Sequence, residues 1–136
     1  FTDLNKDGFF EFEILNGCDM VNCDSTIYVV DRNTLEVRKV LSASMAHLEK
    51  VRKYFVAMER IAGYGAYMYT GYAIRDFKHL YVSQQPSFTL RSYYDFETEK
   101  HICHLAMGRQ RDDTALVRQL IKRYCSGEFT VEVGEK

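Results

Sequence analysis

The chain has 136 residues and a mass of 15.9 kDa, which is enough for one hydrophobic core and too little for two ordinary domains with a linker. Hydrophobic residues make up 46% and charged residues 27%, which excludes a disordered tail and a collagen-like fibre. With a net charge of -1 and no apolar run near the roughly 20 residues that cross a bilayer, we expect a single domain over 1–136 that binds no nucleic acid and has no membrane span.

The first eleven residues contain the pattern D-x-N-x-D-G-x-x-E. Oxygen-bearing side chains at alternate positions of a tight loop turn toward a common centre, and hard oxygen ligands suit Ca²⁺. Gly8 allows the sharp backbone turn after the third ligand. The expected calcium ligands are the side chains of Asp3, Asn5, Asp7 and Glu11 and the carbonyl group of Phe9.

Two other interpretations of this segment are available. An EF-hand needs a bidentate Glu at loop position twelve, where this chain has Ile14, and it needs a helix on each side. An ordinary Asp-Gly surface turn would use the same Asp and Asn side chains for local hydrogen bonds. The EF-hand fails on both counts, whereas the surface turn stays open as the alternative to a calcium loop.

The loop is followed by three strand-like segments. Residues 9–14 alternate between apolar and acidic side chains, with Phe12 and Ile14 on one side, as in a half-buried strand. The segments 26–30 and 35–41 are rich in β-branched residues and are separated by a short polar turn. We expect the last two to form a hairpin.

This calcium loop resembles the strand-flanked loops of FG-GAP and VCBS repeats over residues 1–41, in a single copy. In those families a strand ending in an aromatic residue precedes the loop, a role that suits Phe1, so we expect the chain to begin inside a longer precursor. Small periplasmic proteins with one such loop inhibit lysozyme-like enzymes or give immunity to wall-degrading toxins. The resemblance implies a structural ion that orders a surface for a protein partner.

The even number of cysteines permits disulfides. A local bridge between Cys18 and Cys23 would close a polar loop, and a bridge from Cys103 to Cys125 would staple a helix to a sheet. We expect at least one disulfide and hence an oxidising compartment, periplasmic or extracellular. Two alternatives remain. They are four buried free thiols in a cytosolic protein, and a zinc site that includes the neighbours His101, Cys103 and His104.

Apolar residues at three- and four-residue steps predict a helix over about 44–62. The members of this pattern are Met45, Leu48, Val51, Phe55, Met58 and Ile61. Its charged residues fall mostly on the other side, which indicates a solvated face.

Tyrosines interleaved with glycines mark the following β-prone segment, 64–82. Tyrosine offers a large contact area with a polar tip, which protein interfaces favour. The candidate partner-binding residues are Tyr64, Tyr67, Tyr69 and Tyr72. The alternative is that they line the core face of a twisted strand.

The remainder predicts a hairpin, a helix and a last strand. Residues 88–96 and 101–107 form the hairpin, a second helix spans about 113–126, and residues 129–133 form the strand. The fold class is therefore α+β, with a mostly antiparallel sheet of six to eight strands and two helices.

No complete catalytic constellation is present, because the four histidines come with no activated nucleophile and none of the common hydrolase, phosphate-loop or zinc-protease motifs occurs. We therefore expect a non-enzyme. The leading interpretation is a calcium-binding, secreted or periplasmic protein that binds and inhibits a partner protein such as a toxin or a wall-degrading enzyme. A noncatalytic module of a larger adhesin or hydrolase is the alternative, and an enzyme of unknown class is the second.

Overall fold

The computed structural model describes residues 4, 11–18, 22–31, 34–61, 66–108, 113–125 and 128–132, the last segment as backbone. Within these residues it contains one helix and nine strands. The strands are β1 (Phe12–Cys18), β2 (Cys23–Val30), β3 (Val37–Met45), β4 (His47–Val51), β5 (Tyr54–Ile61), β6 (Ala66–Asp76), β7 (Tyr81–Asp95), β8 (Lys100–Ala106) and β9 (Glu128–Glu132), and the helix is α1 (Thr114–Tyr124). The predicted class, mostly antiparallel β with helix, is confirmed.

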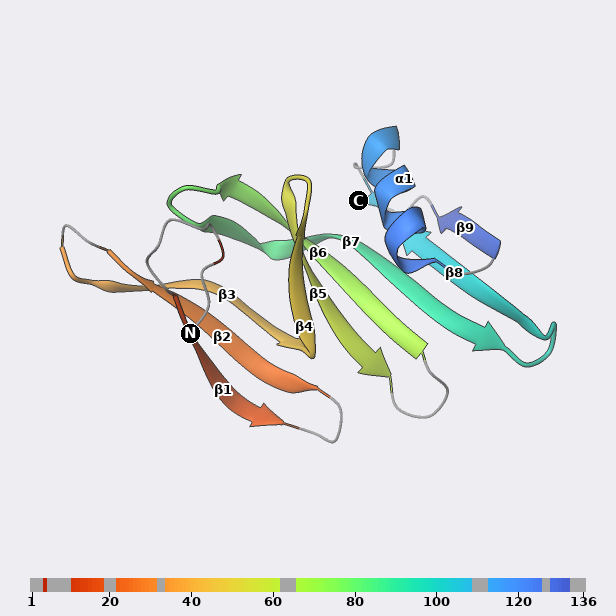
Figure 1. Cartoon of the computed structure of the whole chain (residues 1–136), viewed down its shortest axis with the longest axis horizontal. Helices are drawn as coiled ribbons and strands as arrows, with labels where there is room; N and C mark the ends of the chain where they lie inside the picture. The colour runs from red at the N-terminus through yellow and green to blue at the C-terminus, as the bar shows by residue number, and fades with distance from the viewer. Residues whose placement is uncertain are drawn as a thin grey trace.

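The strands form two sheets (Figure 1). One has the order β1-β2-β3, and the other runs β4-β5-β6-β7-β8-β9. Every pair is antiparallel except β8 with β9, which is parallel because α1 carries the chain from one to the other. The hairpins expected over 26–41 and 88–107 are therefore present as β2–β3 and β7–β8.

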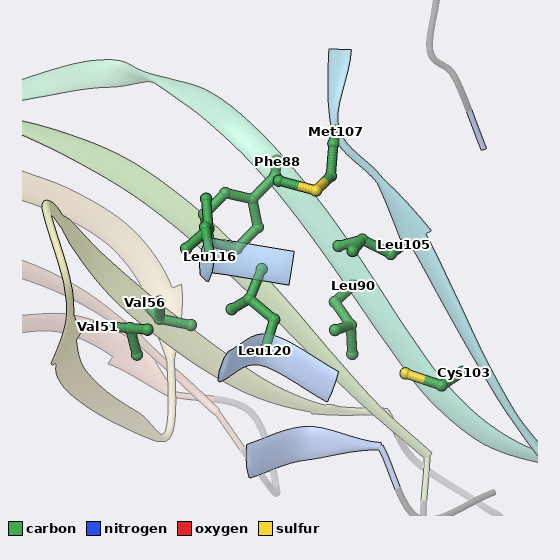
Figure 2. Close-up of a cluster of buried hydrophobic side chains, with 9 residues drawn as sticks. All are labelled: Val51, Val56, Phe88, Leu90, Cys103, Leu105, Met107, Leu116 and Leu120. Atoms are coloured by element: carbon green, nitrogen blue, oxygen red, sulfur yellow. The ribbon is translucent and has the colours of Figure 1, made fainter. Parts of the chain in front are cut away.

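The six-stranded sheet has a hydrophobic cluster on each face. The helix cluster lies under α1 and is drawn in Figure 2; its buried members are Val51, Val56, Phe88, Leu90, Cys103, Leu105, Met107, Leu116 and Leu120. The intersheet cluster lies against the three-stranded sheet; its buried members are Ile27, Val40, Leu41, Met45, Phe55, Ala57, Tyr72 and Leu80. Gly71 is required beside the helix cluster, since a Cβ atom there would lie 2.1 Å from Cε2 of Phe88.

The helix predicted over 44–62 is wrong, because this region forms the end of β3 and the hairpin of β4 and β5. Phe55 and Ala57 pack into the intersheet cluster, whereas Val56 between them packs into the helix cluster. A strand buried on both faces loses its alternation of apolar and polar residues. The apolar residues that remain are spaced as in an amphipathic helix. The two-residue turn at Arg52 and Lys53 contains neither glycine nor proline, so the sequence does not mark it as a turn.

The helix predicted over 113–126 is confirmed as α1. The carboxylate Oδ1 of Asp113 accepts a hydrogen bond from the backbone N–H of Leu116 (3.1 Å) and caps the helix start. Leu116 and Leu120 form its buried stripe, and Lys122 with Arg123 stands in the last turn, where cations interact favourably with the helix dipole. The helix therefore begins and packs as its amphipathic pattern predicts.

Candidate functional site

Glu11 is the only predicted calcium ligand within the described residues; Asp3, Asn5, Asp7 and Phe9 lie outside them. It directly precedes β1 and is 1% exposed. Its Oε2 accepts a hydrogen bond from the backbone N–H of Leu4 (3.3 Å). The backbone of Leu4 and the side chain of Glu11 are therefore in contact.

A buried carboxylate is stable only when hydrogen bonds or a cation compensate its lost hydration. The predicted donors are all oxygens, the set that Ca²⁺ prefers, and Glu11 is the one of them whose burial the structure describes. Among the described residues, no three His, Cys, Asp or Glu side chains are grouped as metal ligands. Any ion site at this loop would therefore depend on Asp3, Asn5 and Asp7.

Two disulfides are present, and they settle the pairing that the sequence left open. Cys18 and Cys23 join the end of β1 to the start of β2, with Cα atoms 4.0 Å apart. Cys103 of β8 is bonded to Cys125, which directly follows α1, with Cα atoms 5.5 Å apart. The expectation of at least one disulfide is confirmed. The zinc and free-thiol alternatives fail because these four cysteines carry no free thiol.

Asn22 connects the Cys18–Cys23 turn to the six-stranded sheet. Its Nδ2 donates to the carbonyl oxygen of Arg60 (2.7 Å), and its Oδ1 accepts from the N–H of Arg60 (2.7 Å). The pairing of β4 with β5 begins at His47 and Met58, so Arg60 has no partner in β4. The side-chain amide of Asn22 forms the hydrogen bonds that a neighbouring strand would otherwise form there. The loop and the sheet edge are thereby held in a fixed relation.

The candidate tyrosines do not form one surface. Tyr64 lies outside the described residues. Tyr72 is buried in the intersheet cluster, whereas Tyr69 packs against the helix cluster and stacks on Tyr124 with ring centroids 4.0 Å apart. Tyr67 is partly exposed beside Tyr69, with ring centroids 6.4 Å apart. Packing accounts for Tyr69 and Tyr72, which leaves Tyr67 as the described tyrosine of this set that is open to a partner.

A cluster around Glu49 was not predicted. The hydroxyl of Tyr124 donates to Oε1 of Glu49, Nη1 of Arg123 lies 3.4 Å from the same oxygen, and Nε2 of His47 lies 3.7 Å from Oε2. The carboxylate therefore ties the end of α1 to the edge strand β4. No local signal reveals it, because Glu49 and Tyr124 are separated by 75 residues.

Burial raises the pKa of Tyr124 above its ordinary value, and the hydrogen bond to Glu49 and the charge of Glu49 raise it further. Arg123 partly opposes this shift. The folded protein therefore holds the Tyr124 proton more tightly than the unfolded chain does. The stabilisation is fully present below the unfolded pKa of about 10 and is lost as the pH rises through the folded pKa.

Replacing Tyr124 by Phe should reduce the alkaline loss of stability. At neutral pH the variant should be less stable by about 1 kcal/mol, the net value of one hydrogen bond. Between about pH 9 and pH 11 its free energy of unfolding should fall less steeply than that of the wild type. Urea unfolding across this range measures both effects. Some slope remains, because burial also raises the pKa values of Tyr54, Tyr69 and Tyr72. Parallel pH profiles would contradict the assignment.

No family model, curated protein or solved structure matches this chain. In the described part of the chain, no helix has the length and apolar character needed to cross a membrane. What the protein does is therefore inferred from its own residues.

Proposed function

We propose that this chain is a calcium-binding protein of the periplasm or the extracellular space that binds and inhibits a partner protein, as an immunity protein or a lysozyme inhibitor does. The observation that carries the proposal is the buried carboxylate of Glu11, which accepts a hydrogen bond from Leu4 across the acidic segment. Leu4 and Glu11 belong to the D-x-N-x-D-G-x-x-E pattern, and this hydrogen bond brings these two residues together.

In this proposal the ion is structural. The side chains of Asp3, Asn5, Asp7 and Glu11 and the carbonyl group of Phe9 would hold it. Bound calcium would neutralise the mutual repulsion of the carboxylates and stabilise the folded state by mass action. The rigid loop would then reduce the entropy lost when a partner binds.

The compartment is supported by the two disulfides. Disulfides persist in oxidising compartments and are rare in reducing cytosol. The bridge from Cys103 to Cys125 joins a sheet to a helix across 22 residues of sequence, so it fixes tertiary structure. Periplasmic or extracellular location is therefore part of the proposal.

The turn between β7 and β8 is the contact surface that we favour. Phe96 is 61% exposed there, and its ring meets that of Tyr94 edge-on, with centroids 4.9 Å apart. The ring of His101 also packs edge-on against that of Tyr94, with centroids 5.1 Å apart. Exposed aromatic groups that are held by neighbours are typical of the residues that dominate binding energy in interfaces. Figure 1 shows this hairpin end projecting away from the three-stranded sheet.

The test is inhibition of a panel of lysozyme-like wall-degrading enzymes, measured with calcium and with a chelator. The calcium-loaded protein should inhibit at least one enzyme stoichiometrically. Replacing Phe96 by Ala should weaken inhibition about tenfold or more, the effect of losing an aromatic anchor. Leu35→Ala is the matched control, because Leu35 is also an exposed apolar side chain in a turn and lies between β2 and β3.

Two outcomes would contradict the proposal. The first is a calcium-loaded protein that inhibits no enzyme of the panel, a result that favours a noncatalytic module of a larger protein. The second is an equal loss of inhibition in the Phe96 and Leu35 variants, which would remove the β7–β8 turn from the contact surface.

A further inference from the structure

A cavity of about 630 Å³ lies between the two sheets, beside the intersheet cluster. Its walls come from β1 and β2, from the end of β3, from the start of β4, from the end of β5 and from Leu4. Leu15, Ile27, Met45 and Leu48 supply apolar surface. Cavities of this size and mixed lining are typical of sites for small molecules.

Alternate residues of β1 line this cavity. Glu13 and Leu15 line the cavity and Ile14 between them does not, and all three residues are exposed, Leu15 at 57% and Ile14 at 46%. Of the strand expected over residues 9–14, the described part is extended from Phe12 onward, and its acidic side faces inward, since Glu11 is buried and Glu13 lines the cavity. β1 is an edge strand of the three-stranded sheet, and it forms one wall of the cavity.

Ser25 supplies a polar atom in the wall of this space. The residue is 1% exposed and lines the cavity, and its hydroxyl has no hydrogen-bond partner within the described residues. Burying a hydroxyl without a partner costs free energy, so such groups usually meet a ligand or a water molecule. The position of Ser25 therefore points to an occupant with a polar group in its middle.

The two sheets contribute opposite charges to the walls. Glu13 comes from β1, and Arg60 comes from β5. Both residues are exposed, and in the described part of the chain neither side chain forms an ion pair. The backbone of Arg60 is fixed by both hydrogen bonds of Asn22, which positions the start of its side chain. A molecule with a cation at one end and an anion at the other would satisfy both charges.

We propose that this cavity binds a short zwitterionic peptide with apolar side chains. Its ammonium group pairs with Glu13, its carboxylate pairs with Arg60, and its apolar side chains lie against Leu15, Ile27 and Met45. A peptide group between the two ends bonds the hydroxyl of Ser25. The inference goes beyond the inhibitor proposal. Leu4 of the proposed calcium segment contributes to the walls, but the residues that would bind the polar groups of the peptide, Glu13, Ser25 and Arg60, lie in β1, β2 and β5.

Titration with the dipeptide Leu-Leu, followed by NMR amide shifts, tests the inference. Shifts should concentrate at residues that line the cavity. Acetylating the ammonium group or amidating the carboxylate should each weaken binding about fivefold, the effect of one partly exposed ion pair. Arg60→Gln should weaken binding of the dipeptide with a free carboxylate by the same factor and leave binding of the amidated dipeptide unchanged. Glu13→Gln should likewise weaken binding of the dipeptide with a free ammonium group and leave binding of the acetylated dipeptide unchanged. Ser25→Ala should weaken all forms.

Arg91→Gln is the matched control, because Arg91 is an exposed arginine of β7 outside this cavity. It should bind Leu-Leu as the wild type does. The inference is overturned if Leu-Leu produces no shifts at millimolar concentration, if the doubly blocked dipeptide binds as tightly as the free one, or if Arg91→Gln and Arg60→Gln lose the same affinity.

Discussion

Replacing Leu120 by Ala should lower the free energy of unfolding by about 3 kcal/mol, within the range for a buried leucine truncated in a packed core. Leu120 is 0% exposed and lies in the helix cluster among side chains of β4, β5, β7 and β8 (Figure 2). Those strands are joined by backbone hydrogen bonds, so they cannot collapse freely into the space that the leucine leaves. Urea unfolding measures the change.

Gln119→Ala is the control for this prediction. Gln119 precedes Leu120 on α1 and is exposed, so its truncation should change stability by less than about 0.5 kcal/mol. Equal stabilities of the two variants would show that α1 does not cover the sheet as described.

Removing the disulfide between Cys103 and Cys125 should cost about 3 kcal/mol. The bridge closes 22 residues of chain, and the loop-closure entropy of the unfolded state grows with the length of the closed loop. The appropriate variant replaces both cysteines by Ala, because Cys103 is fully buried and a serine hydroxyl there would need a partner. Thermal or urea unfolding of the double variant gives the loss.

The disulfide between Cys18 and Cys23 provides the comparison. It closes a separation of 5 residues at the end of a hairpin, so its removal should cost about 2 kcal/mol, less than the longer bridge. A larger loss for the short bridge than for the long one would contradict this explanation. Mass spectrometry of the unreduced wild type should show the loss of four hydrogens, two for each bridge.

The sequence predicted the secondary structure correctly where one face of an element is buried and the other is exposed to solvent. Helix α1 shows this, because Leu116 and Leu120 stand out against exposed neighbours and Asp113 provides a start signal. The hairpin of β7 and β8 was predictable for a similar reason. The hairpin of β4 and β5 was not, because Phe55 and Val56 are buried on opposite faces and local periodicity carries no information about such a strand.

The candidate sites that could be predicted are those formed by residues close in sequence or at the end of a recognisable element. The Cys18–Cys23 bridge was foreseeable because it is local, and the Cys103–Cys125 bridge because one cysteine ends a recognisable helix. The Glu49–Tyr124 contact and the cavity beside Ser25 depend on how distant strands are placed, which no short motif encodes. Tyr72 was a candidate for partner binding because its spacing cannot distinguish a buried face from an exposed one.

Calcium titration by calorimetry, with the melting temperature recorded in parallel, tests the proposed function most directly. The wild type should bind one Ca²⁺, and at about a hundredfold excess over Kd its melting temperature should rise by roughly 10 °C. Asp7→Ala should abolish both effects, whereas the control Asp24→Ala, an exposed acid of β2, should retain them. Identical melting curves in calcium and in chelator, with no heat of binding, would contradict the calcium loop and the inhibitor function built on it.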